Sequence, residues 1–112
     1  MQSAVARPDP YATNEDWAAA GIPLPPANSD YWVSHVEVTG PLTLLVRYRD
    51  GVEGVVRFEK SHLHGVFKPL HDPEFFSQAH VQDGAVTWSD EVDISPDNMH
   101  RHLYAFGEWV LR

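Results

Sequence analysis

Residues 44–56 read LLVRYRDGVEGVV, two alternating runs of apolar and polar side chains around Asp50-Gly51. An Asp-Gly pair between alternating runs is a strong signal for a tight β-hairpin. A three-residue loop with Gly51 in the left-handed position keeps the apolar side chains on one face, whereas a two-residue loop would place Tyr48 opposite Glu53 and invert the pattern. The pairs expected from the three-residue loop are Tyr48 with Val52, Val46 with Gly54, Leu44 with Val56 and, on the other face, Arg47 with Glu53.

A second hairpin is predicted around Asp83-Gly84. A two-residue turn there pairs Val81 with Val86 and His80 with Thr87. Alternation of Val36 and Val38 with polar residues predicts a strand before Gly40-Pro41. A last short strand is expected at Val92 and Ile94.

Short helical turns are expected between the hairpins. Glu59 to Gly65 is predicted to form one helical turn that ends at Gly65. Asp72-Pro73 predicts the start of another, with the carboxylate as N-cap and proline in the first helical position.

The C-terminal region predicts a helix that begins at Ser95-Pro96-Asp97, where the serine hydroxyl is expected to act as the cap. Met99, Leu103, Phe106 and Val110 then recur at helical spacing and form one apolar stripe. We expect this stripe to cover a single apolar sheet surface built from Val36 to Trp88. Gly107 weakens the helix near its end, so residues 109–112 are expected to fray.

The fold class predicted from these elements is α+β, with antiparallel β-hairpins in a meander packed against a C-terminal helix. Residues 1–31 hold five of the nine prolines and are expected to form a Pro-rich N-terminal extension, with residues 32–112 as a single α+β domain. The extension contains one helix candidate, Asn14 to Ala20, with Thr13 as N-cap and Gly21 as its stop. Three tryptophans of the terminal segments are expected to cover the sheet or, alternatively, to anchor a partner: Trp17, Trp32 and Trp109.

The composition excludes several classes of site. The chain of 112 residues has no cysteine, which excludes disulfides, thiolate metal sites and a cysteine nucleophile. Neither a signal-peptide pattern nor an apolar run of about 20 residues is visible, so a soluble, cytoplasmic protein without membrane association is expected. The net charge of −8 disfavours binding to phosphate backbones.

A series of short motifs follows the chain in a fixed order: Pro41-Leu42, Leu44, Val46, Tyr48, Asp50-Gly51, Gly54, Gly65, Phe67, Leu70, Asp72-Pro73, Phe76, Trp88 and Asp93-Ile94-Ser95-Pro96-Asp97. In this order and spacing, the region from Val33 to about His100 resembles a small bacterial family known as domain of unknown function 2442. The chain departs from the family pattern at Ser89-Asp90-Glu91, where members tend to have Pro-Asn-Gly, and at Met99-His100, where they tend to have Leu-Tyr. The resemblance implies a compact α+β accessory domain, in some members joined to a helix-turn-helix or placed beside toxin-like partners, and it implies no activity.

The candidate chemical sites are few. Metal ligation would fall to His62, His64 and His71, whose spacing matches no known ligand motif, and the simpler interpretation is exposed or hydrogen-bonded loop histidines. Neither a nucleophile triad nor a phosphate-binding glycine loop is visible. We therefore expect no enzymatic activity and no cofactor.

The favoured function is a small interaction module, regulatory or antitoxin-like, that binds a basic protein partner through an acidic surface. Between Pro69 and His100 the sequence has seven acidic residues and no lysine or arginine. The residues expected to contact the partner are Asp72, Glu74, Asp90, Glu91 and Asp93. Two alternatives stay open: a metal-binding protein or enzyme that uses the loop histidines, and a nucleic-acid-associated regulator that acts with a partner chain through Arg47, Arg49, Arg57 and Lys60. An exposed sheet edge also leaves a homodimer open.

Overall fold

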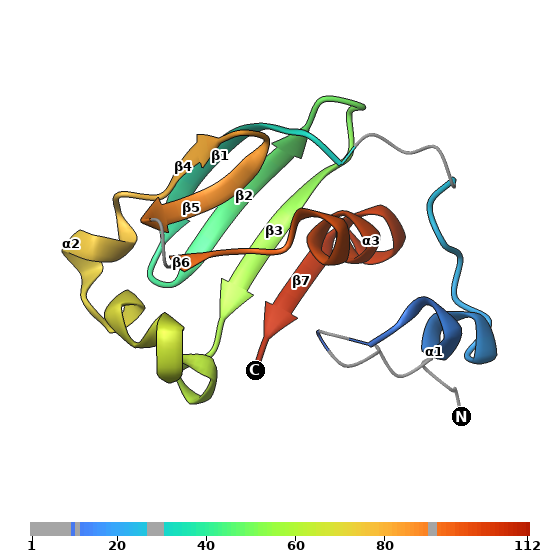
Figure 1. The fold of residues 1–112 in the computed structure, drawn as a ribbon, viewed down its shortest axis with the longest axis horizontal. Helices are drawn as coiled ribbons and strands as arrows, with labels where there is room; N and C mark the ends of the chain where they lie inside the picture. The colour runs from blue at the N-terminus through green and yellow to red at the C-terminus, as the bar shows by residue number, and fades with distance from the viewer. Residues whose placement is uncertain (1–9, 11, 27–30, 90–91) are drawn as a thin grey trace.

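The structure is a computed structural model that describes residues 10, 12–26, 31–89 and 92–112. The elements in chain order are α1 (Asn14–Ala19), β1 (Val33–Gly40), β2 (Thr43–Tyr48), β3 (Glu53–Phe58), the 3₁₀ helices η1 (Lys60–His62) and η2 (Gly65–His71), α2 (Pro73–Phe76), β4 (His80–Gln82), β5 (Ala85–Ser89), β6 (Val92–Asp93), α3 (Pro96–Phe106) and β7 (Glu108–Leu111). The predicted α+β fold class is confirmed: a meander of β1, β2 and β3 packs with a C-terminal helix, and short helical turns follow it (Figure 1).

The strands form two sheets, so the predicted single apolar sheet surface is wrong. One sheet has the order β1-β2-β3-β7, and the other has the order β4-β5-β6. One outer edge of the meander, that of β3, is occupied by β7, which pairs with β3 in parallel. The second hairpin instead lies across the first sheet near β1 (Figure 1), where the Val33 N–H donates to the Gly84 carbonyl at 2.9 Å.

Both predicted hairpin registers are confirmed. In the first hairpin Val46 pairs with Gly54, Leu44 with Val56 and Arg47 with Glu53. Gly51 has a φ of +96°, and its N–H donates to the Tyr48 carbonyl at 3.0 Å to close the loop. In the second hairpin His80 pairs with Thr87 and Val81 with Val86. Asp83 and Gly84 both have positive φ, which is the geometry of a type I′ turn.

The C-terminal helix is shorter than predicted. It ends at Phe106 because Gly107 adopts the left-handed conformation and its N–H donates to the Leu103 carbonyl, a typical helix C-cap. The following residues do not fray. They form β7, in which Trp109 and Leu111 point into the core and are each 1% exposed. The spacing of the stripe up to Val110 fitted a helix, but the alternation of Trp109 with Leu111 fits the strand that is observed.

Of three predictions on the helical turns, two are wrong and one is confirmed. The segment from Glu59 to Gly65 is not one turn, because η1 ends at His62 and Gly65, with a φ of +60°, begins η2. The Ser95 hydroxyl does not cap α3: a capping oxygen would accept a backbone N–H of the first turn, whereas this hydroxyl donates to the Asp97 carboxylate. The predicted start of α2 is confirmed, since the Asp72 carboxylate accepts the Glu74 N–H at 3.0 Å and Pro73 is the first helical residue.

A short N-terminal segment packs against α3 and β7. The predicted helix is confirmed as α1, with a capping box between Thr13 and Asp16. Trp17 is completely buried, and its ring lies 4.9 Å from that of His102 in an edge-to-face contact. The Trp109 indole donates to the Pro10 carbonyl at 3.2 Å. Trp17 and Trp109 therefore cover apolar surface, whereas Trp32 is 45% exposed.

Tyr48 links the first hairpin to the start of α3. Its ring is 1% exposed and its hydroxyl donates to the Pro96 carbonyl at 2.6 Å. Burial raises the pKa of this hydroxyl far above its usual value, and the nearby carboxylates of Asp97 and Asp50 raise the pKa further.

This raised pKa predicts that the domain loses stability in alkali. The neutral phenol is favoured by folding, so its contribution is complete below the unfolded-state pKa of about 10 and is lost as the pH rises above that value. The free energy of unfolding should fall by up to about 1.4 kcal/mol per pH unit from Tyr48. Urea unfolding between pH 8 and pH 11 should show a shallower fall in Tyr48→Phe. Tyr104→Phe, at an exposed position of α3, should retain the fall of the parent protein.

Candidate functional site

The segment from Glu59 to Phe76 connects the two sheets and contains half of the side chains predicted to be functional. Its helices are short, and three apolar side chains fix the segment to the core: Leu63, Leu70 and Phe76 are 3%, 0% and 3% exposed. At its start, the Glu59 N–H donates to the Leu111 carbonyl at 2.8 Å. The polar residues between these anchors are consequently held in fixed places on the surface.

An apolar cavity of about 440 Å³ lies between this segment and the turn that joins β1 to β2. Its apolar lining comes from Val38, Pro41 and Leu42 on the turn side and from Leu70, Pro73 and Phe76 on the helical side. Lys60 and His71 also line the cavity. A mostly apolar hollow of this size with a few polar groups is typical of a binding site for a small molecule or an anchoring side chain.

The three candidate metal-binding histidines do not converge. His62 is 9% exposed, and its ring centroid lies 5.3 Å from that of Phe67, so this side chain belongs to the aromatic core instead of an open loop. His64 is exposed, and its ring centroid lies 6.1 Å from that of His62. His71 Nε2 lies 2.9 Å from the Leu63 carbonyl oxygen. Among the residues that the structure describes, no three histidine or acidic side chains are arranged to hold a metal ion.

The predicted partner-binding acids fall into two groups. Asp72 and Glu74 are exposed at the start of α2, beside the wall that Pro73 and Phe76 give the cavity. Within the described ranges, neither carboxylate takes part in an ion pair. The other group consists of Asp90, Glu91 and Asp93. Asp90 and Glu91 lie outside the described residues, and of Asp93 only the backbone is described, which pairs with Thr87.

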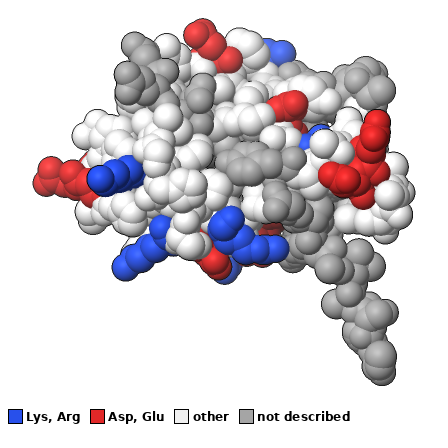
Figure 2. Space-filling model, turned by 60° about the horizontal axis from the view of Figure 1, so that its bottom comes forward, with Lys and Arg blue, Asp and Glu red and all other residues white. Residues whose placement is uncertain are grey.

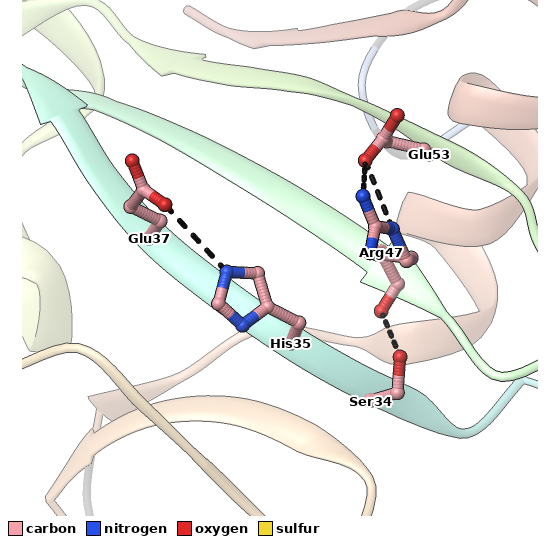
Figure 3. Close-up of polar contacts among 5 residues, drawn as sticks. All are labelled: Ser34, His35, Glu37, Arg47 and Glu53. Atoms are coloured by element: carbon pink, nitrogen blue, oxygen red, sulfur yellow. Dashed lines mark hydrogen bonds and ion pairs between the residues drawn. The ribbon is translucent and has the colours of Figure 1, made fainter.

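Three of the four cations of the nucleic-acid alternative interact with other side chains of the domain. Arg47 donates from Nε and Nη2 to Glu53 Oε2 at 3.0 and 2.7 Å (Figure 3). Arg57 lies 3.2 Å from the Glu108 carboxylate, and the Arg49 guanidinium lies 5.4 Å from the centre of the Trp32 ring. Lys60 lines the cavity. Figure 2 accordingly shows lysine and arginine side chains in small separate groups with acidic side chains beside them.

Comparison with known proteins places the chain in a family. A family model described as protein of unknown function (DUF2442) matches residues 33–104. The chain belongs to the DUF2442 family. The matched region includes every residue that lines the cavity, whereas α1 and β7 lie outside it. No curated protein and no solved structure matches the chain.

The structure of this DUF2442 domain also reveals a hydrogen-bonded His–Asp pair that the sequence did not predict. His100 is 0% exposed, its Nε2 lies 2.8 Å from Asp50 Oδ2, and its ring packs edge-to-face against Tyr31 and Tyr48. A catalytic pair of this kind exposes the imidazole to substrate and buries the carboxylate. Here the arrangement is reversed, because the carboxylate is the more exposed partner. The pair therefore joins α3 to the first hairpin. The sequence signal for the burial of His100 is its spacing of three residues from Leu103, which places both side chains on the same face of α3.

The described part of the DUF2442 chain has no helix with the length and apolar character needed to cross a bilayer. The candidate site consists of the cavity, the exposed carboxylates of Asp72 and Glu74, and the side chain of Lys60. They arise from three parts of the chain that meet where η1, η2 and α2 close over the turn between β1 and β2. The arrangement can hold an apolar group and can interact electrostatically with charges next to that group.

Proposed function

We propose that this domain is a non-enzymatic interaction module that binds a basic segment of a partner protein and anchors it by an apolar side chain in the cavity. The observation that carries the proposal is the position of α2. The same short helix supplies Pro73 and Phe76 to the cavity wall and presents the carboxylates of Asp72 and Glu74 to solvent. The apolar cavity therefore lies beside two negatively charged carboxylates.

The two features have different roles in binding. A large side chain inserted into a mostly apolar cavity supplies most of the affinity of such an interface, because it is removed from water. Exposed carboxylates add little affinity each, but they increase the association rate of a basic partner and select against acidic ones. The absence of cysteine favours a reducing compartment, so we expect the partner in the cytoplasm.

The charge arrangement favours a protein partner over a nucleic acid. Arg47 and Arg57 are paired with Glu53 and Glu108, so they neutralise carboxylates of the domain itself. The chain as a whole has a net charge of −8. A phosphate backbone would have to displace these glutamates and approach a net-negative molecule, both of which oppose binding.

A peptide titration tests the proposal. The probes are short peptides with one leucine, phenylalanine or tryptophan beside two or three lysine and arginine residues, labelled for fluorescence anisotropy. We expect binding that weakens between 50 and 300 mM NaCl, and Glu74→Gln should raise the Kd roughly twofold to fivefold. Gly40→Trp should weaken binding more strongly, since Gly40 lines the cavity, where an indole takes the space of the ligand, and a Cβ at this position meets nothing within 4 Å.

Glu15→Gln is the matched control, because Glu15 is an exposed glutamate on α1 that does not line the cavity. This variant should bind the peptides as the parent protein does. Equal losses in Glu15→Gln and Glu74→Gln, or binding by Gly40→Trp at the parent Kd, would refute the proposed site. Tight binding of a DNA or RNA oligonucleotide at 50 mM NaCl would favour the nucleic-acid alternative instead.

A further inference from the structure

We infer that the group seated in the cavity is the C-terminal residue of the partner, with its apolar side chain inside and its α-carboxylate against Lys60. This inference rests on the proposed function and specifies the ligand of the same site. Two observations carry it: Lys60 lines the cavity, and His71 already forms a hydrogen bond with the Leu63 carbonyl.

Lys60 is the cation available at the cavity. It begins η1 immediately after β3, its side chain is exposed, and it lines the cavity. In the part of the chain that the structure describes, no ion pair involves its ammonium group. An ammonium group at the edge of an apolar hollow, without a carboxylate of its own, is suited to a ligand that is apolar but ends in an anion.

His71 does not share this role in its neutral form. The Leu63 carbonyl oxygen 2.9 Å from His71 Nε2 can only accept a hydrogen bond, so Nε2 must hold the ring proton. The neutral ring then has an acceptor at Nδ1 and no second donor to offer to a carboxylate. The charge of Lys60 is therefore the main determinant that distinguishes an anionic ligand from a neutral one at this site.

The geometry of a chain terminus fits this combination better than an internal acidic residue does. In an internal aspartate or glutamate, the side chain carries the anion, so the residue that meets Lys60 cannot also fill an apolar cavity. In a C-terminal residue, the apolar side chain and the carboxylate are attached to the same Cα atom. No chain then continues past Lys60, and the preceding basic residues can lie toward the carboxylates of Asp72 and Glu74.

Peptides that differ only at the C-terminus test the inference. The probes are acetyl-Lys-Arg-Ser-Gly peptides extended by leucine, phenylalanine or tryptophan, each made with a free carboxylate and with a carboxamide. In the parent protein, the best free acid should bind about fivefold or more tightly than its amide. Lys60→Gln should remove that preference. Lys68→Gln should keep it, because Lys68 is an exposed lysine of η2 that does not line the cavity.

The outcomes separate this inference from the proposed function. If acid and amide bind equally, and binding still depends on salt and on Glu74, the inference is wrong and the proposed function stands. If neither peptide binds, both fail. If N-acetylphenylalanine alone binds as tightly as the full peptide, the site takes a small carboxylic acid and not a protein terminus, which also overturns the inference. A preference for the acid that persists in Lys60→Gln assigns the anion to another group and refutes the role of Lys60.

Discussion

Gly54→Ala should destabilise the domain by about 3 kcal/mol, the upper part of the range that overpacking a core usually costs. Gly54 is the second residue of β3, where the end of α3 approaches the sheet. A Cβ at this position would lie 2.4 Å from the Gly107 carbonyl oxygen and 2.8 Å from Leu103 Cδ2. The leucine can rotate away, but the carbonyl is backbone and also accepts the Val55 N–H at 3.1 Å. Relief of the clash therefore separates β3 from the turn between α3 and β7, and urea unfolding followed by circular dichroism measures the loss.

Gly40→Ala is the matched control for Gly54→Ala. Both glycines lie in strands of the same sheet and neither has a positive φ, but a Cβ at Gly40 meets nothing within 4 Å. The control should change the free energy of unfolding by no more than about 0.5 kcal/mol. A Gly54→Ala variant as stable as Gly40→Ala would contradict the close approach of α3 to β3.

The parts of the fold that the sequence predicts well are the local ones. Asp50-Gly51 and Asp83-Gly84 are flanked by alternating residues, and only one register places the apolar side chains of each hairpin on one face. The starts of α1 and α2 are equally local, since the capping side chain lies within three residues of the N–H that it accepts. In each case the interaction that selects the structure is contained in one short stretch of chain.

The parts that were mispredicted depend on distant contacts. β7 exists because Glu108–Leu111 pairs with β3, a partner about fifty residues earlier in the sequence. The sequence signal for that strand is one alternating pair, Trp109 and Leu111. In the same stretch, Val110 continues the helical spacing of Met99, Leu103 and Phe106, so the pattern fits a helix equally well. Asp50 and His100 are likewise brought together only by the packing of α3 on the first hairpin.

The candidate site was predicted in pieces. Asp72, Glu74, Lys60 and His71 were all named from the sequence, but for three different functions. What the sequence does not contain is the closure of the segment from Glu59 to Phe76 over the turn between β1 and β2, which creates the cavity. That closure depends on buried anchors such as Leu70, whose burial follows from the tertiary fold and not from a local pattern.

Trp17→Ala tests how far the N-terminal segment contributes to the stability of the whole domain. The substitution removes a completely buried indole that contacts the rings of His102 and Phe106, with ring centroids 4.9 and 5.7 Å away. It also removes the ring over which the Arg101 guanidinium lies, at 5.4 Å. Truncation of a buried tryptophan to alanine costs about 3–5 kcal/mol, and we expect a loss of about 3 kcal/mol in urea unfolding followed by circular dichroism.

The size of that loss decides between two physical descriptions of residues 10–26. If the segment is part of one cooperative core, its detachment exposes the apolar side of α3 and β7, so Trp17→Ala lowers the unfolding midpoint of the whole domain. If residues 32–112 fold independently, as the sequence predicts, the segment detaches alone and the unfolding midpoint of the rest hardly moves. Tyr104→Ala is the control, because it truncates a large aromatic side chain of α3 that is 44% exposed. A loss of stability in Trp17→Ala that is no greater than in Tyr104→Ala would show that the buried indole does not stabilise the domain.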